Sequence, residues 1–200
     1  VQTEYLGTSA QWSYYDKGGP PPGWSTEAFD ASSWPTGLTQ LGYGDGDEST
    51  VISWGPSSPS KYLAYYFRAT FDLTSIPDSL ALQLAADDGA VAYLNGTEVV
   101  RDNMPAGTIT NTTRASTGRS GGNENAVRQF TVDASLLHLG TNTVAVEVHQ
   151  DTPNSSDLTF DASVIGTVSP PANEPPVASL STTGSGLSLT FDGSQSSDSD

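Results

Sequence analysis

Apolar residues recur at every second position along several stretches of the chain, which is the period of a strand that buries one face. The longest stretch, residues 65–73, places Tyr65, Phe67, Ala69, Phe71 and Leu73 opposite Tyr66, Arg68, Thr70 and Asp72. Similar alternation links Leu80, Leu82 and Leu84; Phe130 and Val132; Val144, Val146 and Val148; and Leu158, Phe160 and Val164. No helical periodicity persists over ten residues, so the pattern predicts an all-β sandwich or barrel.

The segment from Leu84 to Arg101 predicts a strand, an acidic turn, a strand, a tight hairpin and a third strand. Asn95-Gly96 supplies the two positive-φ positions of a type I′ turn between two β-prone runs. Asp87-Asp88-Gly89 predicts the earlier reversal. Adjacent carboxylates on a turn point apart, so we expect Asp87 and Asp88 to form the turn and anchor loops rather than to act as acid and base.

The first 44 residues are rich in aromatic residues and proline, and they alternate little. They contain Trp12-Ser-Tyr-Tyr-Asp16, Phe29-Asp-Ala-Ser-Ser-Trp34-Pro35 and Leu41-Gly-Tyr-Gly44. Together with the segment Asp87 to Gly96, these motifs resemble those of galactose-binding-like modules attached to glycosidases and other secreted hydrolases. The resemblance extends over residues 10–165 and implies a jelly-roll β-sandwich over residues 1–167.

The composition changes after Gly166. Residues 168–176 hold four prolines and cannot form a ladder strand, which predicts an extended linker. Residues 177–200, with Leu187-Ser-Leu-Thr-Phe191 and the Asp- and Ser-rich end, resemble the start of a PKD-type, immunoglobulin-like domain. Such a domain needs about seven strands and about 100 residues. We therefore expect this chain to be a piece of a larger multidomain protein, and the PKD-like part favours a bacterial host.

The charge balance limits the classes of molecule that this protein is expected to bind. The formal net charge is −16 with seven Lys and Arg, which argues against nucleic acid or an anionic membrane surface. The chain has no Cys, so disulfides, thiolate metal sites and a Cys nucleophile are excluded. No apolar run is long enough to insert into a membrane. We expect the protein to be secreted, because its sequence is acidic, lacks Cys and is rich in Ser, Thr and Asn.

Motifs for catalysis are weak. Gly118-Arg-Ser120-Gly-Gly122 matches the G-x-S-x-G pattern, but no strand-turn-helix signal surrounds it, so a loop is expected. His138 and His149 have no metal-ligand spacing.

Carboxylates are the best candidates for a metal site. Asp45, Asp47 and Glu48 lie within four residues beside glycines, a ligand set suited to Ca²⁺, although a solvated acidic loop explains them equally well. The resemblance implies a structural Ca²⁺ between an early loop and the last strands, for which Asp157 and Asp161 are the late candidates.

Aromatic side chains stack on sugar rings, and most of those in this chain lie in its first third. Trp24 and Trp54 are predicted to be exposed because proline and glycine surround them, and Tyr66 is a further candidate. His149 ends a strand and is expected either at the surface or in a ligand groove.

The leading hypothesis is a non-catalytic extracellular accessory module, binding a carbohydrate or another cell-surface polymer, that targets or orients a neighbouring hydrolase domain. The carbohydrate part depends on the resemblance. A structural or adhesion spacer without sugar binding and a jelly-roll polysaccharide-degrading enzyme are the alternatives.

Overall fold

The computed structural model describes residues 1–169 and 176–197. The chain divides into two compact units, Val1–Val168 and Ser169–Asp200. The described elements of the first unit are β1 (Gln2–Leu6), β2 (Gln11–Tyr15), β3 (Thr36–Leu38), β4 (Leu41–Tyr43), β5 (Thr50–Val51), β6 (Ala64–Leu73), β7 (Ser79–Ala86), β8 (Gly89–Leu94), β9 (Thr97–Asp102), the 3₁₀ turns η1 (Gly121–Asn123) and η2 (Ala134–Leu136), β10 (Arg128–Val132), β11 (Gly140–His149) and β12 (Leu158–Thr167).

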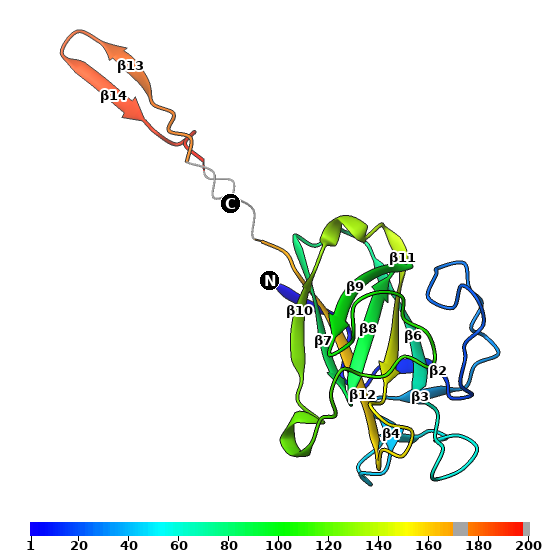
Figure 1. The fold of residues 1–200 in the computed structure, drawn as a ribbon. Coiled ribbons are helices and arrows are strands. Elements are labelled where there is room, and N and C mark those ends of the chain that lie inside the picture. Colours follow the sequence, from blue (N-terminus) through cyan, green and yellow to red (C-terminus); the bar gives the residue numbers. More distant parts are fainter. Residues whose placement is uncertain (170–175, 198–200) are drawn as a thin grey trace. The chain divides into compact units, whose positions relative to one another are not determined.

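The first unit is a sandwich of two six-stranded sheets (Figure 1). One sheet has the order β10-β7-β12-β4-β5, and β1 also pairs with β12. The other sheet has the order β3-β2-β6-β11-β8-β9. The strand pairings within both sheets are antiparallel apart from the short parallel pair β4–β5. The predicted all-β sandwich is confirmed.

The core lies between the sheets and is built from the alternating residues that the sequence singled out. Phe67 of β6 stacks on Phe160 of β12 with ring centroids 3.9 Å apart, so it joins one sheet to the other. Trp12 meets Phe160 edge-on at 5.0 Å. All three side chains are fully buried. Burial of such large apolar side chains is the main favourable contribution to folding.

The predicted hairpin is present between β8 and β9. Asn95 and Gly96 adopt φ values of 51° and 85°, as a type I′ turn requires. The Asn95 side chain also donates hydrogen bonds to the Leu136 carbonyl and the Asn142 side-chain oxygen. This turn therefore sets the strand register and also fastens the loop before β11.

The second unit contains the antiparallel pair β13 (Ser181–Ser185) and β14 (Ser188–Asp192). β14 overlaps the segment Leu187-Ser-Leu-Thr-Phe191 that was quoted for the PKD-type resemblance. Most of the linker predicted at residues 168–176 and the last three residues of the predicted PKD-type fragment lie outside the described residues. The assignment of 177–200 to a PKD-type domain stays a prediction.

Candidate functional site

Two long loops cover parts of the outer face of the sheet that contains β6 and β11. The loop between β2 and β3, residues 16–35, packs Trp24 and Phe29 against a cluster that includes Tyr66. The loop that follows β9 packs Met104 against Val91. Alternation alone predicts an open polar face at these strands, whereas the loops close much of it.

Arg68 of β6 holds the first of these loops in place. Only 5% of the residue is exposed. Its guanidinium donates hydrogen bonds to the backbone oxygens of Trp24, of Thr26 at 3.0 Å and of Phe29 at 3.4 Å. Burial lowers the pKa of Arg68 from its usual value. Arg68, which points outward from β6, thus satisfies three carbonyl groups of the loop of residues 16–35, which pairs with no strand of the sheet.

Trp24 and Tyr66, two of the predicted ligand residues, pack on each other. Their ring centroids lie 4.8 Å apart in an edge-on arrangement, and Trp24 also meets Tyr93 edge-on at 5.7 Å. Tyr66 is buried and Trp24 is partly buried. The expectation that Trp24 is an exposed platform is wrong, because the loop folds back over β6 and uses this ring as its own anchor.

His149 is also buried, so neither the surface nor the open-groove expectation for it holds. Its Nδ1 atom lies 2.8 Å from the Thr113 oxygen, and its Nε2 atom lies 3.1 Å from Glu147 Oε2. The Tyr93 hydroxyl donates to the other oxygen of Glu147 at 2.7 Å. The loop after β9 covers this network, which explains its burial.

An open groove runs along the outer face of β2, β6 and β11, beside the loop of residues 16–35. We call it the sheet groove; its volume is about 480 Å³. Its lining is mostly polar, with hydroxyl, amide and carboxylate groups, and Phe29 and Trp34 add aromatic surface. The polar contributors include Gln11, Ser13, Glu27, Thr70 and Thr141. Arg68 also lines it, so the residue that orders the loop is part of the groove.

Trp54 is 46% exposed, as predicted, and lies in a different place from the sheet groove. It lines a hollow of about 140 Å³ together with Tyr43 and Lys61. Its ring meets Tyr43 edge-on at 6.2 Å, and the Lys61 ammonium lies 4.6 Å from the centre of the Tyr43 ring. Gly44 also lines this hollow, which therefore adjoins the acidic loop.

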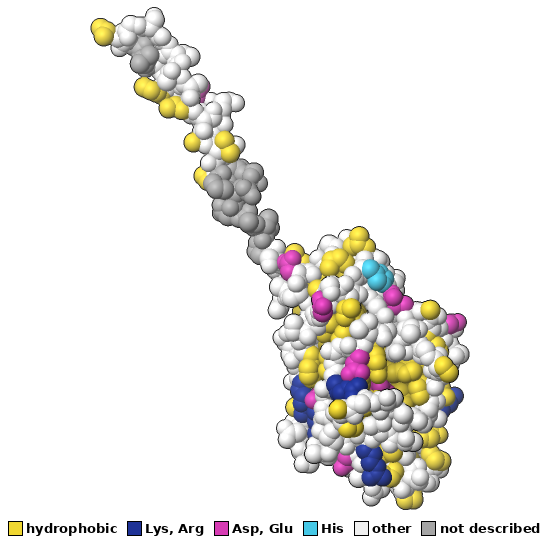
Figure 2. Space-filling view, turned by 45° about the horizontal axis from the view of Figure 1, so that its top comes forward, with side chains coloured by type: hydrophobic (Ala, Val, Ile, Leu, Met, Phe, Trp, Pro, Cys, Tyr) yellow, Lys and Arg dark blue, Asp and Glu magenta, His cyan; other side chains and the backbone are white. Residues whose placement is uncertain are grey.

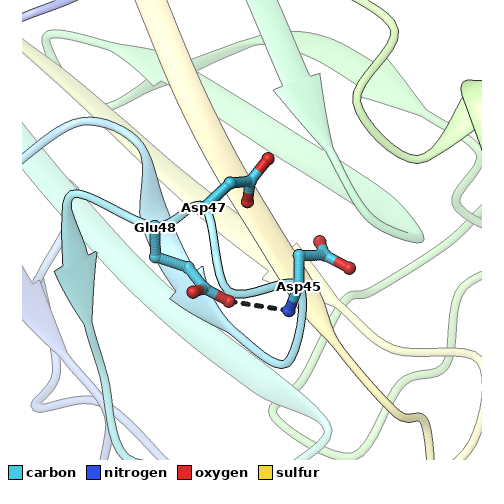
Figure 3. A group of neighbouring side chains, drawn as sticks. All are labelled: Asp45, Asp47 and Glu48. Atoms are coloured by element: carbon cyan, nitrogen blue, oxygen red, sulfur yellow. Dashed lines mark hydrogen bonds between the residues drawn. The ribbon is translucent and has the colours of Figure 1, made fainter.

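Asp45, Asp47 and Glu48 form a group whose carboxylates lie within 4.8 Å of one another (Figure 3). Glu48 accepts hydrogen bonds from the amides of Asp45 at 2.9 Å and Gly46 at 3.0 Å. Asp45 accepts one from the Thr159 hydroxyl at 3.2 Å. The carboxylate oxygens suit a hard cation such as Ca²⁺. The carboxylate of Glu48, however, already accepts hydrogen bonds from amides of its own loop.

The two late metal candidates are placed differently. Asp157 is close to the acidic loop, because a Cβ atom on Gly44 would lie 2.8 Å from Asp157 Cα, and its charge adds to burial in raising the pKa of Asp45. Asp161 pairs with Ala85 in the middle of β12 and lines a small hollow with Thr8 and Val127. Within the described part of the chain, neither joins the compact group of three carboxylates.

The turn between β7 and β8 anchors loops, as expected. Asp88 accepts hydrogen bonds from the backbone amides of Arg119 at 2.6 Å and Asp151 at 2.8 Å, which ties two distant loops to the turn. Asp87 is buried, and its Oδ1 atom has no hydrogen-bond partner. Burial, followed by the charge of Asp88, raises the pKa of Asp87 to about 8. No local sequence pattern predicts that this turn is buried.

The G-x-S-x-G match has no catalytic setting. Ser120 is exposed and precedes only the 3₁₀ turn η1, so the strand and helix of a nucleophile elbow are missing at this position. Lys and Arg form only small isolated patches on the face shown in Figure 2. Among the described residues, no helix is long and apolar enough to cross a membrane.

Comparison with solved structures identifies the fold. The chain resembles part of a calcium-binding mutant of Bacteroides uniformis β-glucuronidase 2, with a TM-score of 0.54 and 17% identity over 84% of this chain and 18% of that chain. It also resembles a β-glycosidase from Bacteroides vulgatus, with a TM-score of 0.51 and 12% identity over 98% of this chain and 24% of that chain. No family model and no curated protein matches the sequence.

The sequence identities are low, so these similarities show a shared β-sandwich fold alone. The chain spans about a fifth of the length of these glycosidases. The matched region is therefore only a part of each of these longer chains.

Proposed function

We propose that the first unit is a non-catalytic carbohydrate-binding module that targets or orients a hydrolase domain of the same polypeptide. The observation that carries this proposal is the sheet groove, a hollow of about 480 Å³ on the outer face of the sheet. Sugars present hydroxyl groups around apolar ring faces, and they bind where polar groups and aromatic carbon lie together. Hydroxyl and amide groups supply the first requirement in this groove, and the partly buried Phe29 supplies the second, with a small contribution from Trp34, which is 6% exposed.

The composition of the groove disfavours the alternative of a polysaccharide-degrading enzyme. Hydrolysis of a glycosidic bond usually requires two carboxyl groups on opposite sides of the bond. Glu27 is the one carboxylate among the described groove residues, and it lies 2.5 Å from the Nε2 atom of His138. A single carboxylate held by a neighbour suits ligand binding better than acid and base catalysis.

Affinity electrophoresis through gels that contain a panel of polysaccharides tests the proposal. Thr70 is exposed on β6 inside the groove, so Thr70→Trp fills it without removing a buried contact. Thr131→Trp is the matched control, because Thr131 is an exposed β-strand threonine that lines a smaller hollow on the other sheet. We expect at least one polysaccharide to retard the unaltered chain and Thr131→Trp, but not Thr70→Trp.

Two results would contradict this proposal. Retardation of Thr70→Trp equal to that of the unaltered chain would place the binding surface elsewhere, with the Trp54 hollow as the next surface to examine. Migration unaffected by every polysaccharide would favour a structural or adhesion spacer.

Ca²⁺ bound by Asp45, Asp47 and Glu48 is a second part of the proposal, supported by their mutual distances of at most 4.8 Å. Asp157 is the nearby late carboxylate, and Asp161 is the more distant one. We also propose that the protein is secreted from a bacterial cell and continues into a PKD-type domain. The acidic, Cys-free composition supports secretion, and the residues after 176 support the PKD-type domain. Repeating the gels with EDTA and then with added Ca²⁺ tests whether sugar binding needs the ion.

A further inference from the structure

The charged side chains of the sheet groove are already held by other groups of the protein. The Arg68 guanidinium is 5% exposed and donates to three carbonyl groups of the loop that covers it. Glu27, the other ionisable residue of the described groove lining, lies 2.5 Å from the Nε2 atom of His138. Next to the groove, Asp72 of β6 accepts a hydrogen bond from the Thr141 hydroxyl at 2.6 Å. These charges therefore take part in contacts within the protein.

Three hydroxyl groups of the groove have no such partner. They belong to Ser13 of β2, Thr70 of β6 and Thr143 of β11, which are adjacent strands of one sheet. Within the described part of the chain, none of these hydroxyls makes a hydrogen bond. Thr70 is exposed, Ser13 is partly buried, and Thr143 is 4% exposed. The groove is therefore the place where these hydroxyls meet water or a ligand.

The register of the strands arranges the three hydroxyls in an oblique row across the sheet. Thr70 pairs with Thr143, and Ser13 pairs with Arg68, which precedes Thr70 by two positions on the same face of β6. Neighbouring strands lie about 4.8 Å apart, so a ligand that meets all three hydroxyls extends over at least about 10 Å. A single sugar ring is shorter than this. The row therefore suits a chain of linked sugars that crosses the strands.

The loop beside the row adds an apolar surface. Phe29 lines the groove, is partly buried and packs edge-on against Trp34 with ring centroids 5.5 Å apart. Aromatic carbon binds the apolar face of a sugar ring. A hydroxyl group is both donor and acceptor, so the free hydroxyls of the sheet match those of a sugar without a charge on either side.

The charge of the whole chain disfavours an acidic polymer. The formal net charge is −16, and a protein of this charge repels a polymer that carries many negative groups, most strongly at low salt. A uronic acid could gain from the groove only by reaching the guanidinium of Arg68. That group is nearly enclosed and already has three carbonyl partners, so it offers a carboxylate little.

We infer that the sheet groove selects an uncharged polysaccharide chain, held across the strands by the hydroxyls of Ser13, Thr70 and Thr143, and excludes chains that carry carboxylate or sulfate groups. This inference rests on the proposed function, since it names the substrate class of the same groove. The groups that are free to bind a ligand are neutral, whereas the charged groups stabilise the loop and the edge of the groove.

The first test is affinity electrophoresis at neutral pH with galactomannan, xylan and mixed-linkage glucan as neutral probes, and with alginate and polygalacturonate as acidic ones. We expect a neutral probe to retard the chain and the acidic probes not to. The retarding polymer is then carboxymethylated, which should weaken retention at least fivefold. Its hydroxyethylated form is the matched control, because it carries a neutral substituent in place of the charge. Retention by the neutral polymer should change less than twofold when NaCl is raised to about 0.5 M.

The second test removes the hydroxyls. Thr70→Val keeps the shape and the strand preference of the side chain but has no hydroxyl. One neutral hydrogen bond has a modest net effect, so we expect retention by the neutral polymer to weaken about threefold in Thr70→Val and about tenfold when Ser13→Ala is added. Thr131→Val is the control on the other sheet and should change retention less than twofold. Thr70 is exposed and makes no side-chain hydrogen bond among the described residues, so its variant should fold.

Three outcomes overturn the inference. If an acidic polymer retards the chain as strongly as a neutral one, Arg68 takes a carboxylate after all. If Thr70→Val with Ser13→Ala binds like the unaltered chain, the row of hydroxyls does not hold the ligand. If no polymer of either kind retards the unaltered chain, the proposed function fails as well, and this result is distinct from retention by acidic polymers.

Discussion

Replacing Arg68 with methionine should loosen the loop of residues 16–35 while the sandwich stays folded. Arg68 is buried beneath the loop and donates to three of its carbonyl groups. Methionine has a similar length and keeps the apolar contacts of the stem, but it has no donor. The variant therefore separates the hydrogen bonds from the packing.

The magnitude follows from the contacts. A hydrogen bond to a charged group contributes about 1.5–3 kcal/mol, and the bonds to Trp24 and Thr26 are the close ones. Part of this is offset, because burial disfavours the guanidinium charge and the freed carbonyls of a surface loop regain water. We expect opening of the loop to become easier by about 2–4 kcal/mol. Since 1.4 kcal/mol is a factor of ten, opening should increase about 30- to 700-fold.

Hydrogen exchange measures this opening directly. The amides of Thr26, Phe29 and Trp34 are bonded within the loop, so they report on its closed form. Arg128→Met is the control, because Arg128 donates to carbonyls of another loop, at Asn123 and Ala126. Exchange of the loop amides within threefold of the unaltered chain would refute the role given to Arg68. Loss of the global unfolding transition would also refute it, since the loop would then be inseparable from the core.

The remaining predictions concern the sandwich. Asp88→Asn should lower the free energy of unfolding by about 2–4 kcal/mol in urea titrations, because one of two buried loop amides loses its acceptor; a loss below 1 kcal/mol would contradict this. Phe160→Ala should cost about 3–5 kcal/mol, because it leaves a cavity beside Phe67. In EDTA, stability should fall as pH rises from about 4 to about 8, since burial, then Asp88, raises the pKa of Asp87 to about 8 and the folded protein retains a proton that the unfolded chain releases; Asp87→Asn should flatten this dependence. A chain ending at Val168 should keep the Tm of the full chain, because the two units are separately compact; a drop of more than 5 °C would show that they depend on each other.

The strands and the hairpin could be predicted because their signals are local. Alternation from residue 65 to 73 corresponds to β6, and the Asn95-Gly96 turn joins β8 to β9. Each signal depends on residues a few positions apart, and the strand period and turn chemistry are general.

The surroundings of the outward-facing residues could not be predicted in the same way. Alternation correctly assigns Tyr66 and His149 to the face opposite the core, but it does not show what covers that face. The covering loops come from residues 16–35 and from the segment after β9, which are distant in sequence. The buried partners of a strand residue are set by these long-range contacts, and no local pattern encodes them.

The same limitation applies to the charged residues on the outward faces of the strands. An outward position on a strand that carries Arg68 or Glu147 would ordinarily be exposed, and its burial has a desolvation cost that a loop must offset with hydrogen bonds. At Arg68 the loop does so with three carbonyls, and the space left between loop and sheet is the sheet groove. At Asp87 one carboxyl oxygen is buried without a hydrogen-bond partner. Arg68 therefore keeps its charge because the chain supplies its hydrogen-bond partners, whereas Asp87 retains a proton up to about pH 8, because burial, followed by the charge of Asp88, raises its pKa to about 8.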